Sequence, residues 1–94
     1  MNNANPVDMK ITELLYFLEL SKDWSVGRAA KRLGISQPTL SISVKSLESK
    51  VGGELLFRGK RGLGAPTLLG LSILPKIRAL KKIIVGLLEV CEHE

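Results

Sequence analysis

Cysteine, histidine and aromatic side chains are scarce in this 94-residue chain, and each scarcity narrows what the chain can do. With a single cysteine, Cys91, no disulfide can form within the chain, which suits a reducing cytoplasm. One histidine and one cysteine supply neither a metal-ligand cluster nor a nucleophile paired with a base. Only four aromatic residues are available for stacking on single-stranded bases. The sequence therefore predicts no enzyme, no metal site and no cofactor.

Long apolar runs are also lacking. The apolar stretch Ile83–Leu88 is far too short to cross a bilayer, and charged residues interrupt the segment before it. The opening residues, MNNANPVDMK, lack the apolar centre of a signal peptide. We therefore expect no membrane partner. The alternative that the basic last helix lies on a membrane surface is disfavoured, because its charges do not gather on one polar face.

Positive charge, by contrast, is abundant and concentrated in the middle of the chain. The sequence carries 14 basic and 9 acidic residues, for a net charge of +5. Residues 25–61 hold eight of the basic residues and only two acidic ones. This excess is typical of a phosphate-binding surface, although a solvated surface that keeps a small protein soluble explains it equally well.

A helical repeat of apolar residues follows a polar N-terminal arm. Asp8 is the candidate N-cap of this first helix, and the helix is expected to end near Lys22–Asp23. Its apolar residues recur at intervals of three and four, namely Ile11, Leu14, Leu15 and Leu18. One face of the helix is therefore expected to be buried.

The next segment predicts two helices joined by a glycine turn. Ser25 is the N-cap of a helix over residues 26–33, and Gly34 permits the turn that ends it. Ser36 is the N-cap of the following helix, which has Pro38 in its first turn and ends at Gly52. This arrangement is typical of a helix-turn-helix over about residues 26–45. A plain three-helix packing module is the alternative.

A hairpin and a long helix complete the predicted fold. Glycines and basic residues over about 54–66 predict a β-hairpin wing, with an ordinary surface loop as the alternative. Thr67 is the N-cap of a last helix that runs to about Glu92. The apolar seam of that helix steps by four and three, through Ile73, Ile77, Leu80, Ile84, Leu87 and Cys91. A small domain has no obvious surface to cover a seam of roughly 27 Å, so a second copy is the expected partner.

Three stretches of the chain carry a family resemblance: SVGRAAKRLGISQPTLSISVKSLESKVGGELLFR, PTLLG and LLGLSILPKIRAL. Together they resemble the N-terminal DNA-binding domain of LysR-type transcriptional regulators. The resemblance covers about Ile11 to Leu88, and the Ser36-Gln37-Pro38 step is among its most specific parts. It implies a mainly α fold, with a winged helix-turn-helix over residues 1–66 and a linker helix over 67–94. It also implies a homodimer with antiparallel linker helices, bound to pseudo-palindromic double-stranded DNA.

The resemblance further implies roles for individual residues. Contacts from the recognition helix are expected at Gln37, Pro38, Ser41, Ile42 and Lys45. Phosphate contacts are expected at Ser25, Arg28, Ser36 and Thr39, and wing contacts at Arg58, Lys60 and Arg61. Two positions depart from the family pattern: Ile42 stands where a polar residue is common, and Gly27 stands where threonine is usual.

Other interpretations stay open at this point. The N-terminal domain of a molybdate-responsive regulator looks similar, although the Ser-Gln-Pro step favours the LysR type. A helical protein-interaction module, which binds a partner through the seam, belongs to a different class. The family's effector-binding domain is expected to be missing because the chain stops at Glu94, so we expect no small-molecule effector to bind. A full-length parent could also form higher oligomers.

Overall fold

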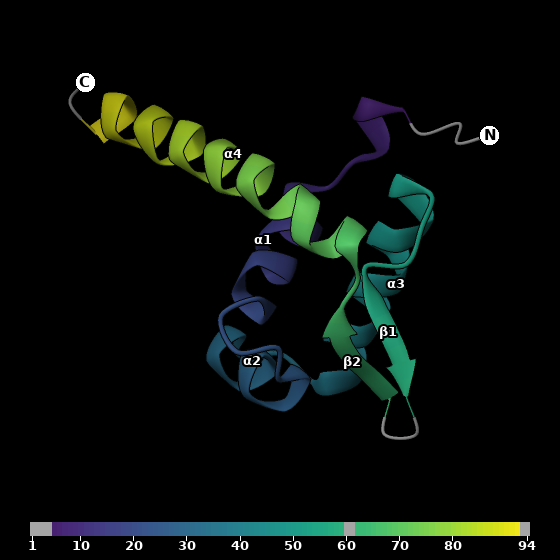
Figure 1. Ribbon diagram of the computed structural model, residues 1–94. Coiled ribbons are helices and arrows are strands. Elements are labelled where there is room, and N and C mark those ends of the chain that lie inside the picture. The colour runs from purple at the N-terminus through teal and green to yellow at the C-terminus, as the bar shows by residue number, and fades with distance from the viewer. Residues whose placement is uncertain (1–4, 60–61, 93–94) are drawn as a thin grey trace.

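The computed structural model describes residues 5–59 and 62–92 (Figure 1). The elements in chain order are a short 3-10 turn η1 (Pro6–Asp8), α1 (Ile11–Leu20), α2 (Val26–Leu33), α3 (Gln37–Val51), β1 (Leu56–Gly59), β2 (Gly62–Pro66) and α4 (Leu68–Glu92). The two strands pair antiparallel. The predicted fold class, a mainly helical winged helix-turn-helix followed by a long helix, is confirmed.

The helix-turn-helix forms through the caps that the sequence predicts. The hydroxyl of Ser25 accepts a hydrogen bond from the backbone N–H of Arg28 at 3.2 Å. The hydroxyl of Ser36 accepts one from the backbone N–H of Thr39 at 3.1 Å. Gly34 adopts the left-handed conformation with φ of 70°, which a side chain would disfavour. Local sequence therefore sets both ends of the turn.

The beginning of α1 differs from the prediction. Asp8 lies in η1, and Lys10 occupies the N-cap position without a side-chain hydrogen bond. Pro6 favours a separate turn because its ring fixes φ, and its carbonyl accepts a hydrogen bond from the backbone N–H of Met9 at 3.2 Å. The helix also ends earlier than predicted, at Leu20.

The turn between α1 and α2 is held by an aromatic pair. Trp24 has a left-handed backbone with φ of 56°, which is unusual for a bulky residue. Its ring packs edge-on against Phe17 with the ring centres 5.7 Å apart. Its backbone N–H also donates to the carbonyl of Leu20 at 2.7 Å. Packing against the buried Phe17 compensates for the strained backbone and sets the direction in which α2 begins.

The helices α1, α2 and α3, the strand β1 and the first turns of α4 share one hydrophobic core. Two alanines of α2, Ala29 and Ala30, let that helix approach its neighbours closely. The buried apolar residues are Phe17, Leu20, Ala29, Ala30, Leu40, Val44, Leu47, Leu55, Leu56, Leu74 and Ile77. Two of these belong to the first turns of α4, which then extends away from the other helices (Figure 1). No helix within residues 5–59 and 62–92 is long and apolar enough to span a membrane.

Candidate nucleic-acid interface

The helix α3 turns one face to the core and the opposite face to solvent. Leu40, Val44 and Leu47 are buried, whereas Ile42 is 66% exposed and Lys45 is exposed. Ser36, Gln37, Pro38 and Thr39 are exposed at the start of the helix, and Ser41 is half-buried at the boundary between the faces. The structure thus gathers all the residues predicted for the recognition helix on one element, with only Ser41 partly covered.

The first turns of α2 and α3 border a surface hollow of about 530 Å³. It is lined by Ser25, Gly27, Arg28, Ala30, Lys31, Ile35 and Gln37. Two cations and the backbone N–H groups at a helix start suit this hollow to a phosphate group. Lys31 was not among the predicted phosphate contacts, although it belongs to the basic residues concentrated in 25–61. Among the described residues, neither Lys31 nor Lys45 forms an ion pair, so both remain available to an anion.

Gly27 leaves space for the side chain of Gln37. A Cβ atom at Gly27 would lie 3.3 Å from the Gln37 amide nitrogen, which is closer than most such contacts. The departure from threonine at this position therefore bears directly on where the Gln37 amide lies.

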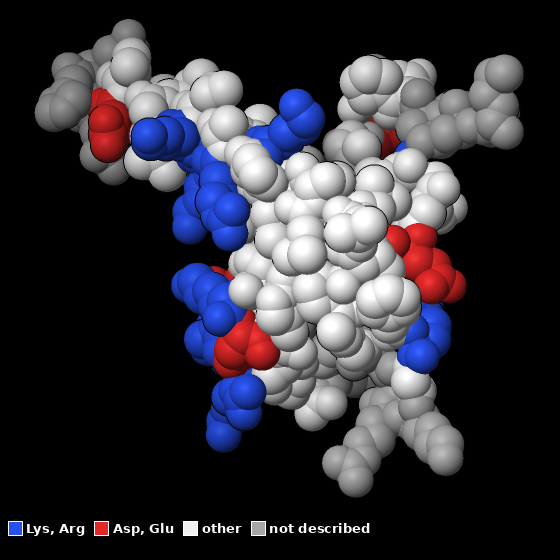
Figure 2. All heavy atoms as spheres, in the orientation of Figure 1, with Lys and Arg blue, Asp and Glu red and all other residues white. Residues whose placement is uncertain are grey.

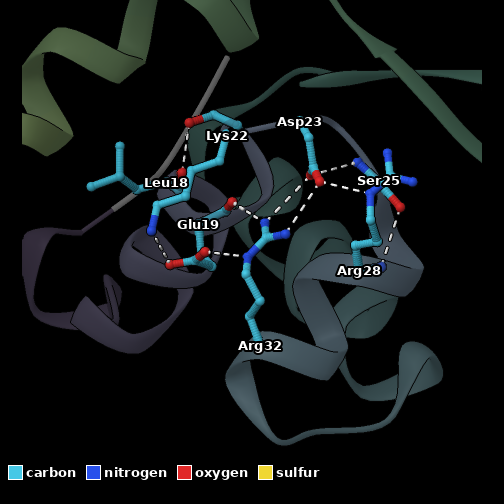
Figure 3. A network of polar contacts seen from close by, with 8 residues as sticks. Leu18, Glu19, Lys22, Asp23, Ser25, Arg28 and Arg32 are labelled. Carbon is cyan, nitrogen blue, oxygen red and sulfur yellow. Dashed lines mark hydrogen bonds and ion pairs between the residues drawn. The ribbon is translucent and has the colours of Figure 1, made fainter.

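Two arginines of α2 are engaged by carboxylates at the end of α1 and in the turn that follows it (Figure 3). The Asp23 carboxylate accepts from Arg28 Nε at 2.8 Å and lies 3.2 Å from a terminal nitrogen of Arg32. Glu19 accepts from Arg32 Nε at 2.6 Å and pairs with Lys22 at 3.0 Å. Arg32 first, and then Arg28, hold the pKa of Asp23 well below its usual range. Arg32 and Lys22 likewise lower the pKa of Glu19, and Asp23 and Glu19 raise the pKa of Arg32.

The wing arginine is tied to α3 instead of being free at the tip. Arg58 forms an ion pair with the buried carboxylate of Glu48 and donates to the carbonyl of Leu56 at 3.0 Å. Glu48 also accepts from the backbone N–H of Leu55 at 2.7 Å. The sequence pattern did not predict this role of Glu48, because the role depends on a strand that lies later in the chain. The other two predicted wing cations, at 60–61, lie outside the described residues.

Charged side chains are unevenly distributed over the surface. Figure 2 shows basic side chains gathered along one side of the molecule below α4, beside a group of carboxylates, whereas much of the face toward the viewer is uncharged. The exposed cations of α4 are Lys76, Arg78, Lys81 and Lys82. The last helix therefore adds four exposed cations to the basic residues of 25–61.

The predicted seam of α4 is divided into a covered part and an open part. Ile77 is 3% exposed within the core, and Ile73 packs against that core. Leu80 and Ile84 are half-buried, whereas Leu87 is 62% exposed and Cys91 is exposed. The structure differs here from the expectation of one continuous free seam, because α1 and the core cover the first turns of the helix. The apolar surface left open lies in the outer half of α4.

Residues 11–71 match a family described as bacterial regulatory helix-turn-helix proteins of the lysR family. The chain therefore belongs to the LysR family, and this match decides against the molybdate-type alternative. It is 40% identical over 70 residues to the small neutral protease regulatory protein of Streptomyces coelicolor, covering 74% of this chain and 22% of that protein. It is 41% identical over 63 residues to the regulator XapR of Escherichia coli K12, covering 67% and 21% respectively. The chain thus spans about a fifth of the length of these relatives.

Solved structures show the same fold. Full-length OxyR from Pseudomonas aeruginosa superposes with a TM-score of 0.83 at 34% identity, over 90% of this chain and 28% of that one. The CbnR DNA-binding domain, solved as a complex with DNA, superposes with a TM-score of 0.80 at 28% identity, over 90% and 97%. The second match covers nearly the whole of a chain that was captured on DNA.

Proposed function

We propose that this chain binds double-stranded DNA sequence-specifically and, as a homodimer, regulates transcription in the bacterial cytoplasm. The observation that carries the proposal is the exposed face of α3, which lies beside a cationic hollow at the start of α2. That helix is wide enough to fill a major groove, and its side chains include both hydrogen-bonding and apolar groups. Belonging to the LysR family supports the same function.

Phosphate contacts supply most of the affinity in this proposal. Arg28 and Lys31 line the hollow, and Ser25 and Ser36 stand at the starts of the two helices. Cations release counterions when they neutralise phosphates, so binding weakens steeply as salt rises. Arg28 must share its guanidinium between a phosphate and Asp23, whereas Lys31 has no ion pair within the described part of the chain.

Base contacts supply the sequence preference. Gln37 is exposed at the start of α3 and can donate to and accept from one adenine edge at the same time. Ser41 and Thr39 can contact base edges or phosphates. Lys45 lies about two helical turns after Gln37 on the same helix. The wing cations Lys60 and Arg61 are proposed to contact the DNA backbone, while Arg58 of β1 is paired with Glu48 of α3.

The outer half of α4 is the proposed dimer contact. Its exposed large apolar residues are Ile83, Val85, Leu87, Leu88 and Val90. Ile84 and Cys91 continue the predicted seam along the same segment. Pairing two copies would remove this surface from water, which is the usual driving force for association. It would also set the spacing of the two half-sites, near one helical turn of roughly 34 Å.

The first experiment titrates fluorescent random-sequence duplex DNA with the purified chain at two salt concentrations, with light scattering recording its mass. Salt-sensitive binding by a dimer is expected. Lys45→Ala should weaken binding to all sequences alike and reduce the salt slope by about one. Lys10→Ala is the matched control, because Lys10 stands at the start of α1, away from the starts of α2 and α3.

Gln37→Ala tests the base contact separately. It should leave binding to random DNA nearly unchanged and relax preference at one base pair, by about 1–3 kcal/mol of lost discrimination. Unchanged relative affinities among sites would remove Gln37 from base recognition. A folded dimer that binds no DNA at low salt would overturn the proposal and favour a protein-interaction module.

A further inference from the structure

Ile42 is an apolar residue in the middle of the exposed face of α3. Its side chain is 66% exposed, although the helix has three fully covered apolar positions of its own at Leu40, Val44 and Leu47. Ile42 lies about half a turn from Leu40 and from Val44, which directs it away from the core. The packing of this domain therefore does not account for an isoleucine at this position.

Ile42 forms a short apolar row with Pro38 on the surface of α3. Pro38 lies one turn earlier at the i−4 position and is exposed. Lys45 follows at i+3 and is also exposed, and Ser41 beside the row is small and half-buried. Ile42 thus lies on the exposed face of α3 between a proline and a cation.

The chemistry of an isoleucine limits what it can recognise in DNA. It has no hydrogen-bonding group, so it cannot distinguish bases by their donors and acceptors. The apolar group presented in the major groove is the methyl on C5 of thymine. A β-branched side chain in a helix is also nearly fixed in one rotamer, so little conformational entropy is lost when it makes contact.

We infer that Ile42, with Pro38 beside it, selects a pyrimidine 5-methyl group in the major groove. The inference rests on the proposed function. It adds that one base pair of each half-site must carry a pyrimidine 5-methyl group. Thymine supplies this methyl in ordinary DNA, and 5-methylcytosine presents the same group at the same place. Binding at that position therefore responds to the methyl group itself.

The test starts from the duplex that the chain selects out of random sequence. Each thymine in that duplex is replaced singly by uracil, which removes the methyl and leaves the hydrogen-bonding edge intact. Affinity should fall about fourfold at one position per half-site, the effect of losing one buried methyl contact. The same replacement of thymine by uracil should not change the affinity of the Ile42→Ala variant. Ile42→Val keeps a branched apolar side chain and should retain most of the fourfold effect.

A second arm distinguishes the two sources of the methyl. Cytosine and 5-methylcytosine are placed in turn at the responsive position. The methylated base should bind the natural chain about fourfold more tightly than cytosine and should give no such gain with Ile42→Ala. Thermal unfolding of both Ile42 variants confirms that they fold, which the exposure of this side chain leads us to expect.

The outcomes separate this inference from the proposed function. Salt-sensitive, sequence-specific binding that ignores every uracil substitution would overturn the methyl contact and leave DNA binding intact. A uracil effect of the same size in Ile42→Ala would assign the methyl to another side chain and overturn the role of Ile42. Failure to bind any duplex at low salt would overturn the proposed function, and the inference with it.

Discussion

The turn between α2 and α3 and the junction of the wing with α4 are held by contacts of different range. At the first turn, the Ser36 hydroxyl accepts a hydrogen bond from the Thr39 backbone three residues away. Gly34 takes a left-handed backbone conformation with hydrogen bonds only to Ala30 and Lys31. At the junction, Glu48 holds a strand seven residues or more further on, and the Thr67 hydroxyl donates to the carbonyl of Glu54 at 2.6 Å. A local turn depends on single residues, whereas the junction depends on several segments that fit together.

The largest effect is expected at the junction, from Gly70→Ala. A Cβ atom at Gly70 would overlap the backbone carbonyl oxygen of Leu55, and a backbone atom cannot swing aside. We expect a loss of roughly 2–3 kcal/mol in the free energy of unfolding, measured by chemical denaturation. Gly86→Ala is the matched control in the same helix, because a Cβ there meets nothing within 4 Å. Equal stability of the two variants would show that α4 moves freely against the wing.

Glu48→Ala should break the junction from the side of α3. The backbone N–H of Leu55 and the guanidinium of Arg58 would both lose their carboxylate partner. Leaving a buried donor unpaired costs about 1–3 kcal/mol, and the detached wing should also weaken DNA binding. Glu54→Ala serves as the control because it removes the same charge from an exposed position nearby. Urea unfolding and DNA titration read out the two effects, and a loss of stability as large for Glu54→Ala would refute the role of Glu48.

Ser36→Ala tests the local turn and should have a smaller effect. Loss of this cap removes one hydrogen bond to the Thr39 N–H at the start of α3, with a cost of about 1 kcal/mol. Ser36→Asp keeps a capping oxygen and should restore stability in thermal unfolding. Ser49→Ala, an exposed position near the end of α3, provides the baseline. A loss that matches the one at Glu48 would erase the distinction between local turn and junction.

The smallest effect concerns pH at the turn before α2. Arg32 lowers the pKa of both Asp23 and Glu19 in the folded chain. Their contribution to stability is therefore present above the pKa values of the unfolded chain and is lost as pH falls below about 4. Because Asp23 is exposed and Glu19 is only half-buried, solvent screens both ion pairs. Arg32→Gln should therefore flatten this acid-induced loss only modestly, as measured by thermal unfolding from pH 7 to pH 2. Lys45→Gln should leave the pH profile unchanged, and an equal change in both variants would contradict the assignment.

The predictions that held rest on short-range patterns. Ser25, Gly34 and Ser36 act within three or four residues, so the bounds of α2 and α3 follow from local chemistry. Thr67 accepts a hydrogen bond from the Gly70 N–H at 3.0 Å, as the predicted cap of α4 requires. The expectation for Asp8 was wrong because Pro6 competes for the same turn.

The sequence by itself determined the order of the elements, the ends of three helices and the side chains on the exposed face of α3, because capping and helical periodicity act over a few residues. Only the tertiary structure decided that Arg58 binds Glu48, that Arg28 is shared with Asp23 and that Ile77 lies in the core. These assignments depend on which segments meet in space. A repeat of apolar residues shows that a helix buries one face, but the length of face that the domain itself covers is set by packing.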